Sequence, residues 1–269
     1  MTSVRPAAIA GLFYPGTAAE LAHHVETLLE AAAPGASAAV PKAIIAPHAG
    51  FVYSGPIAAR AYALIASASA RIRRVVLLGP THRVAIHGMA LPGVDAFATP
   101  LGTIPIDQAS VKTLMALPYV GVNAEAHRLE HSLEVQLPFL QKVLGEFTLL
   151  PLAVGRATAQ KVADVLNLMW GGAETLIVIS SDLSHYLPYA DAQRVDHDTA
   201  QAILNLHTGI SHQQACGATP VTGLTLLAQQ RSLQPTLVDL RNSGDTAGDK
   251  ARVVGYGSFA FYEPAHTAH

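Results

Sequence analysis

The sequence contains a single cysteine, Cys216, among its 269 residues. No internal disulfide can form, and the reducing cytoplasm is the compartment that suits such a chain best. Three roles are open to Cys216: a core residue, a reactive thiol or a metal ligand. Its position in the fold has to decide among them.

Charged residues are also scarce, at 13% of the chain, and the formal net charge is only −2. No basic run marks a path for a phosphate backbone, which argues against nucleic acid as a partner. The sequence has no run of roughly 18 uncharged apolar residues that could span a membrane. It also does not start with a basic segment followed by a long apolar run, which is the pattern of an export signal. We therefore expect a cytoplasmic protein that neither inserts into a membrane nor is exported.

The common motifs for nucleotides and hydrolases are missing. There is no Gly-x-Gly-x-x-Gly after a strand, no P-loop, no Cys-x-x-Cys, no His-Glu-x-x-His and no Gly-x-Ser-x-Gly. These absences argue against nucleotide binding and against a serine hydrolase.

Half of the residues are hydrophobic, which is ample for a buried core. Short apolar runs rich in β-branched residues alternate with segments of helical period, which predicts an α/β fold with a largely buried central sheet flanked by helices. The loops over 33–41 and 242–249 are too short to link domains, so residues 1–269 are expected to form a single domain. The predicted strands span 42–46, 74–79, 148–153, 175–180, 236–239 and 252–261. The predicted helices span 17–32, 56–66, 106–117, 129–144, 159–170, 190–207 and 220–230.

Three of the predicted strands end in polar side chains that can bind metals or move protons. His48 follows the first strand, His82 the second, and Asp182 and His185 follow the strand over 175–180. Ligands bind outside the carboxyl ends of strands in open α/β sheets, so neighbouring parallel strands would bring these groups to one edge. A single histidine at a strand end can equally serve to bond a nearby carbonyl. Repetition at three strand ends favours a common site.

His131 and Glu134 form a second candidate pair, at the start of the predicted helix over 129–144. Residues three apart are neighbours on one helical face, so Glu134 could orient His131, or the two could flank a substrate. An ordinary helix start that carries an acidic residue explains the pair equally well.

Cys216 lies just before a predicted helix that Thr219 would cap. The positive end of the helix dipole would lower the pKa of the thiol and favour the thiolate that binds metals. A set of His48, His82 and Cys216 would suit Fe(II), Zn(II) or copper. Asp182 and His185 would then act as a further ligand and as an acid or base.

Eight short sequence blocks are ordered along nearly the whole chain: Arg5-Pro6-Ala7, Ala10-Gly11-Leu12-Phe13-Tyr14-Pro15, Pro47-His48-Ala49-Gly50-Phe51-Val52-Tyr53-Ser54-Gly55, Leu78-Gly79-Pro80-Thr81-His82, His131-Ser132-Leu133-Glu134, Gln136-Leu137-Pro138, Ser180-Ser181-Asp182-Leu183-Ser184-His185-Tyr186 and Ser243-Gly244-Asp245. Taken together, these blocks resemble the Memo protein family.

The resemblance implies a fold similar to the class III extradiol ring-cleaving dioxygenases, which are non-haem Fe(II) enzymes. It implies that His48, His82 and Cys216 bind the metal, with Cys216 in place of the dioxygenases' carboxylate. Asp182 and His185 match the remaining pocket residues, with His185 resembling the catalytic acid or base. His131, Glu134 and Tyr53 are expected beside the substrate or behind the ligands.

Two features set this chain apart from those relatives. A thiolate donates more charge than a carboxylate and is itself oxidisable, so ring cleavage does not transfer directly from the dioxygenases. Phe51 stands where the family is expected to have a tyrosine, so one phenol hydroxyl is missing.

The resemblance also suggests partners. Animal members resemble signalling adaptors that bind phosphorylated receptor peptides and handle iron or copper. Microbial members are found with a radical-SAM protein and a third, uncharacterised partner. The alanine-rich composition favours the microbial setting.

Three functions follow from these observations. The first is a redox enzyme, similar to a dioxygenase, that uses Fe(II) or copper on an unknown small molecule. The second is a scaffold that binds metal or a phosphopeptide without turnover. The third is hydrolysis by a water bound to Zn(II).

Overall fold

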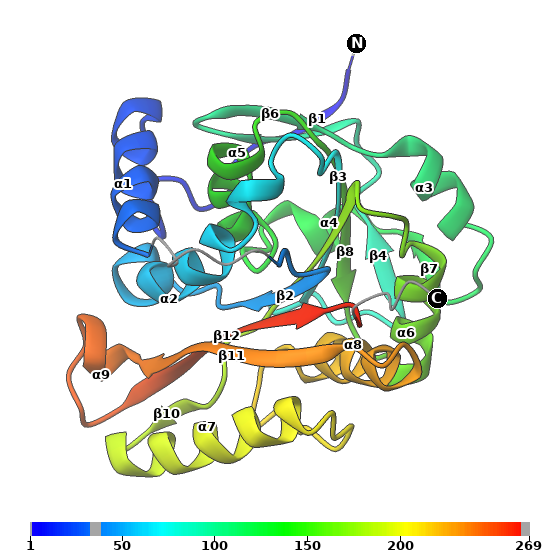
Figure 1. The fold of residues 1–269 in the computed structure, drawn as a ribbon. Coiled ribbons are helices and arrows are strands. Elements are labelled where there is room, and N and C mark those ends of the chain that lie inside the picture. Colours follow the sequence, from blue (N-terminus) through cyan, green and yellow to red (C-terminus); the bar gives the residue numbers. More distant parts are fainter. Residues whose placement is uncertain (1, 33–38, 265–269) are drawn as a thin grey trace.

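The computed structural model describes residues 2–32 and 39–264, which form one α/β domain around a mixed central sheet (Figure 1). Among these residues, nine strands make up the sheet in the order β10-β12-β2-β9-β3-β8-β4-β7, with β11 paired to β12, and β1, β5 and β6 form a smaller sheet. The strands are β1 (Val4–Arg5), β2 (Ala43–Ala46), β3 (Arg74–Pro80), β4 (Met89–Leu91), β5 (Ala96–Thr99), β6 (Gly102–Pro105), β7 (Val120–Val122), β8 (Thr148–Val154), β9 (Thr175–Ser180), β10 (His185–Leu187), β11 (Gln234–Asn242) and β12 (Val253–Tyr262).

The middle of the sheet is parallel, and its register aligns the strand ends. Strand β9 lies between β2 and β3, with Ser180 opposite Ala46 and Ile179 opposite Leu78. Strand β8 continues the parallel arrangement beyond β3. The carboxyl ends of β2, β9 and β3 therefore meet at one edge, as the sequence analysis assumed.

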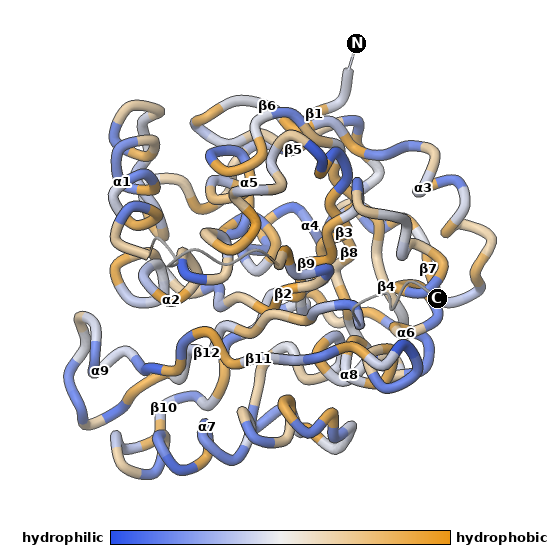
Figure 2. Tube along the Cα trace, in the orientation of Figure 1, coloured by the Kyte–Doolittle hydropathy of each residue, from blue (hydrophilic) through white to orange (hydrophobic). Residues whose placement is uncertain are grey.

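Both faces of the central strands are buried, and alternate residues of each strand pack into different cores. In β9, Leu176 and Val178 join one core, whereas Ile177 and Ile179 join the other. Such double burial is typical of parallel strands, which read as continuous apolar runs. Figure 2 shows the middle strands mostly in the hydrophobic colour and helix α7 in both colours.

Helices cover both faces of the sheet. Residues of α1, α2 and α5 belong to one core, and residues of α6, α7 and α8 belong to the other. The helices are α1 (Ala18–Ala31), α2 (Phe51–Ala63), α3 (Gln108–Leu114), α4 (Ala124–Arg128), α5 (Leu137–Leu144), α6 (Ala159–Leu168), α7 (Tyr189–Leu204), α8 (Ala218–Gln230) and α9 (Ser243–Thr246), with short 3₁₀ turns at Ala66–Ala68 and Glu134–Gln136. In the described part of the chain, no helix has the length and apolar character needed to cross a membrane.

The α/β class and all six predicted strands are confirmed, each within a few residues of its expected bounds. Six further strands were not predicted from the sequence: β1, β4, β5, β6, β7 and β10. Each of these six strands has only two to four residues, too few to show a clear periodic pattern. The loop expected over 33–41 falls largely outside the described residues.

Several predicted helix boundaries are wrong. Helix α2 begins at Phe51 rather than at Pro56, so the proline lies inside it and the carbonyl of the exposed Val52 loses its helical partner. No continuous helix spans 129–144, because Pro138 cannot donate and a new helix, α5, begins beside it. The expected loop over 242–249 contains α9, which Asn242 caps.

A buried ion pair fixes the amino-terminal segment on the body of the domain. Arg5 Nη1 lies 2.6 Å from Glu134 Oε2, and the two side chains are 4% and 0% exposed. The Glu134 carboxylate also accepts hydrogen bonds from the backbone N–H of Ala8 and Ile9 and from the hydroxyl of Tyr14. One carboxylate thus holds the segment from Arg5 to Tyr14 in place.

We predict that Arg5→Met destabilises the domain by about 3–5 kcal/mol, because it leaves the Glu134 charge buried without its partner. The measurement is the free energy of unfolding in urea. Arg128→Met is the matched control, since Arg128 forms an exposed pair with Glu125 and its loss should change stability little. Similar, small losses in the two variants would contradict the prediction.

Candidate metal centre

The shared strand edge carries the polar residues that the sequence analysis singled out. His48 follows β2, His82 follows β3, and Asp182 and His185 come after β9. The rings of His48 and His82 lie 5.2 Å apart between centroids. The structure therefore brings these predicted site residues together.

Hydrogen bonds behind His48 fix its tautomer. The ring is buried, with Nδ1 2.9 Å from Ser180 Oγ. The single hydroxyl hydrogen of Ser180 is donated to the Ser132 carbonyl at 2.5 Å, and Gln136 Nε2 donates to Ser180 Oγ at 2.8 Å. Ser180 must therefore accept from His48 Nδ1, which leaves Nε2 unprotonated, as a metal ligand must be, and facing the Cys216 thiol at 3.3 Å.

His82 is oriented in the same way by a buried carboxylate. Its Nδ1 donates to Glu130 Oε1 at 2.8 Å, and its backbone N–H donates to Glu130 Oε2 at 2.6 Å. Burial alone would raise the pKa of Glu130, but the hydrogen bonds that it accepts from His82 and from the backbone N–H of Ser132 bring it down to about 2. The carboxylate is ionised, and His82 Nε2 is left as the ligand atom.

His131 completes a cluster of three imidazoles. Its ring stacks on His82 with 4.5 Å between centroids, and Phe13 packs against it at 5.0 Å. One ring nitrogen each from His48, His82 and His131 lies within 4.8 Å of the others. Burial lowers the pKa of His131 to about 4 despite the nearby Glu130 carboxylate, so the ring is neutral at neutral pH.

Cys216 reaches this cluster through His48. Its Sγ lies 3.3 Å from His48 Nε2 and accepts the backbone N–H of Asp182 at 3.3 Å. Gly217 permits this approach, since a Cβ there would lie 2.7 Å from the Ser181 side chain. Burial, followed by the charge of Asp182, raises the pKa of the thiol to about 12.

The expectation that a helix dipole lowers this pKa is therefore wrong. Helix α8 begins at Ala218 with Gly217 as its N-cap, and Thr219 does not cap it. The thiol of Cys216 lies against the end of β9, where the loss of solvation outweighs the partial charge of one helix end.

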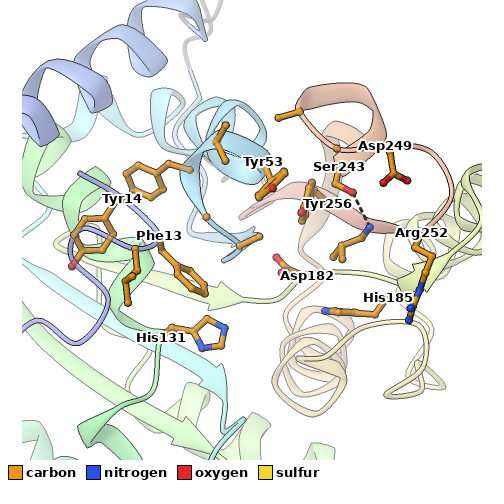
Figure 3. Close-up of a pocket in the computed structure, with 18 of the residues that line it drawn as sticks. Phe13, Tyr14, Tyr53, His131, Asp182, His185, Ser243, Asp249, Arg252 and Tyr256 are labelled. Carbon is orange, nitrogen blue, oxygen red and sulfur yellow. Dashed lines mark hydrogen bonds between the residues drawn. The ribbon is translucent and has the colours of Figure 1, made fainter. Parts of the chain in front are cut away.

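Asp182 and His185 complete the polar floor of the site. Asp182 Oδ1 accepts the backbone N–H of His48 at 2.7 Å, and burial raises the pKa of Asp182 to about 6. His185 Nδ1 donates to the Leu183 carbonyl at 2.8 Å, so its Nε2 is free to accept a proton. Figure 3 shows the His185 ring extending toward Asp182.

A cleft of about 880 Å³ opens above these residues, and aromatic side chains form much of its wall (Figure 3). Phe13 and Tyr53 line it from the amino-terminal segment and from α2, and Tyr256 lines it from β12. Burial and the charge of Asp182 raise the pKa of Tyr256, so its hydroxyl stays protonated. A second cavity of about 820 Å³ is lined by His82, His185 and Cys216.

Glu134 and Tyr53, which the sequence placed near the substrate, lie in different surroundings. Tyr53 lines the cleft. The Glu134 carboxylate turns away to Arg5 and Tyr14, and it is Glu130 that contacts His131, at 3.3 Å from Nδ1.

The family comparison agrees with these observations. The family model described as "Memo-like protein" matches residues 5–260. The chain belongs to the Memo family. A MEMO1 family protein of Aquifex aeolicus is 37% identical over 94% of this chain and 97% of its own length. A MEMO1 family protein of Aeropyrum pernix is 35% identical over 94% and 98% of the two chains.

A solved structure shows the same fold at low sequence identity. An uncharacterized protein of Escherichia coli K12 superimposes with a TM-score of 0.51 and 13% identity, over 80% of this Memo family protein and 98% of that chain. This likeness concerns the fold alone.

Sequence reasoning missed four residues of this Memo family site: Glu130, Ser180, Arg252 and Tyr256. Glu130 directly precedes His131 in the sequence, and this adjacency was the available signal. The helical spacing between His131 and Glu134 favoured Glu134 instead. The chain around Glu134 forms only a 3₁₀ turn, Glu134–Gln136, and helix α5 begins after it.

We predict that Glu130→Gln lowers the affinity for a divalent metal by about 10–100-fold, because a neutral amide orients His82 more weakly than a carboxylate does. The measurement is a competition titration with Co(II) against a coloured chelator. Glu125→Gln, at an exposed position, should keep the wild-type affinity. Wild-type affinity in a folded Glu130→Gln variant would contradict this role of Glu130.

Proposed function

We propose that this Memo family protein is a metal-dependent oxidoreductase that acts on a small organic molecule, with non-haem iron as its metal. The observation that carries the proposal is the set of His48, His82 and His185, whose Nδ1 atoms are each held by a group behind the ring. This arrangement leaves three unprotonated Nε2 atoms at one strand edge, and His185 also lines a cleft of substrate size.

The donor atoms fit a first-row divalent metal. His48 and His82 would hold it, with His131 or Cys216 as the third ligand. Imidazole suits Fe(II), copper and Zn(II), and thiolate shifts the preference toward softer ions. When bound, Fe(II) would supply a Lewis-acidic centre that can exchange electrons with oxygen and substrate.

The remaining residues would handle the substrate and its protons. His185 Nε2 has a free lone pair and can take a proton from a bound hydroxyl and return it later. Asp182 lies beside the cluster, in the same cleft. Phe13 and Tyr53 would exclude water from one face of the substrate.

A hydrolase is the second candidate, and the composition of the cluster favours it. Three neutral imidazoles with an open position form a common catalytic zinc site, in which the bound water becomes the nucleophile. The radical-SAM partner that the family resemblance suggests, and a role as a scaffold without turnover, both stay predictions.

We predict that protein purified without oxygen, chelator or a histidine tag contains about one iron per chain. His48→Ala should abolish binding, as measured by mass spectrometry of bound metals. His131→Ala and Cys216→Ala separate the two candidates for the third ligand, because the larger loss of iron identifies it. His197→Ala, at an exposed position on α7, is the control.

Stoichiometric zinc in place of iron would move hydrolysis ahead of oxidation. If the wild-type protein binds no metal even after reconstitution, the metal-dependent proposal fails.

We predict that His185→Gln slows oxygen uptake with catechol by about 10²–10⁴-fold and leaves the iron content unchanged, because proton transfer is lost while the ligands remain. An oxygen electrode gives the rate. A wild-type rate in His185→Gln would remove His185 from the proton transfer, and no uptake by the iron-loaded wild-type protein would argue against the oxidoreductase.

A further inference from the structure

Two polar side chains that line the cleft of about 880 Å³ have no role in the proposed metal chemistry. The first is Tyr256. The residue is 2% exposed and lines the cleft. Its hydroxyl makes no hydrogen bond to any residue that the structure describes, and it is not among the polar atoms that are sealed off from solvent. A ligand oxygen in the cleft would supply the missing acceptor.

Arg252 is the second group, and it lies at the lip of the same cleft (Figure 3). Its guanidinium lies 5.2 Å from the centre of the Tyr186 ring, and it pairs with no carboxylate in the described part of the chain. The Asp249 carboxylate on the same lip instead accepts the backbone N–H of Ala251 at 2.7 Å. Arg252 therefore offers an unpaired positive charge to whatever enters.

Tyr186 is held at this lip by an unusual backbone. Its φ of 59° lies in the left-handed region, which a tyrosine rarely adopts, and its side chain is 61% exposed. Such conformations persist where the surrounding structure fixes them, often at functional sites. The ring of Tyr186 contacts Arg252 as a cation–π partner.

We propose that the cleft selects an aromatic carboxylate. The ring lies against Phe13 and Tyr53, the carboxylate pairs with Arg252, and Tyr256 donates a hydrogen bond to an oxygen of the ligand. The Arg252 guanidinium can pair with a carboxylate, a monoanion, through two parallel hydrogen bonds. A phosphate dianion carries more negative charge, so the nearby Asp249 and Asp182 carboxylates would repel it more strongly. The inference deepens the proposed function by naming its substrate class.

The test compares three probes with the same ring and different charge: 4-hydroxyphenylacetate, 4-methylphenol and tyramine. Binding is measured by calorimetry at low salt, on protein stripped of metal and on protein loaded with iron. We expect the carboxylate to bind about fivefold to tenfold more tightly than the amine in both forms.

Variants assign this preference to residues. Arg252→Gln should remove the preference for the carboxylate, whereas Arg194→Gln, on the outer helix α7, should keep it. Tyr256→Phe should weaken the binding of the carboxylate and of 4-methylphenol alike by about fivefold, through the loss of one hydrogen bond. Tyr262→Phe, at the end of the same strand, is the matched control.

Equal binding of all three probes, or a preference that survives Arg252→Gln, would overturn the proposal. Tighter binding of phenyl phosphate than of 4-hydroxyphenylacetate would overturn the assignment to a carboxylate. The preference for the carboxylate over the amine is also measured on metal-free protein. It can therefore be present when iron does not bind, and it can be absent when iron does bind. The two proposals therefore fail separately.

Discussion

The parallel register of β2, β9 and β3 is the constraint on which the site depends. Because the three strands run side by side in one direction, their carboxyl ends meet and place His48, Asp182 and His82 at one edge. The apolar faces of these strands, buried on both sides, keep the register from slipping. A shift by one residue would turn core side chains toward the opposite core and separate the histidines.

Hydrogen bonds behind the histidine rings orient them for metal binding and proton transfer. A serine hydroxyl, a carboxylate and a backbone carbonyl accept hydrogen bonds from His48, His82 and His185 respectively. These three acceptors differ in kind, yet each leaves Nε2 of its ring unprotonated. The buried Arg5–Glu134 pair contributes from further away, because it fixes the segment that carries Phe13 against His131.

The sequence predicted the long central strands and the residues that follow them, because both depend on local pattern and on a general property of α/β sheets. It could not predict contacts between distant segments. Glu130 lies 48 residues from His82 in sequence, and Tyr256 reaches the cleft only because β12 pairs with β2. The mistaken preference for Glu134 arose from assuming a helix where Pro138 starts a new one.

Cys216 shows why an argument from neighbouring residues alone can give the wrong direction for a pKa shift. Proximity to a helix start favours thiolate, but that field acts over one turn, and the thiol is half-buried beside Asp182, where the loss of solvation raises its pKa. Burial also keeps the neighbouring imidazoles neutral, as the lowered pKa values of His48 and His131 show. Neutral imidazoles retain the lone pairs that bind a metal, so the burial that disfavours the thiolate also prepares His48 and His131 as ligands.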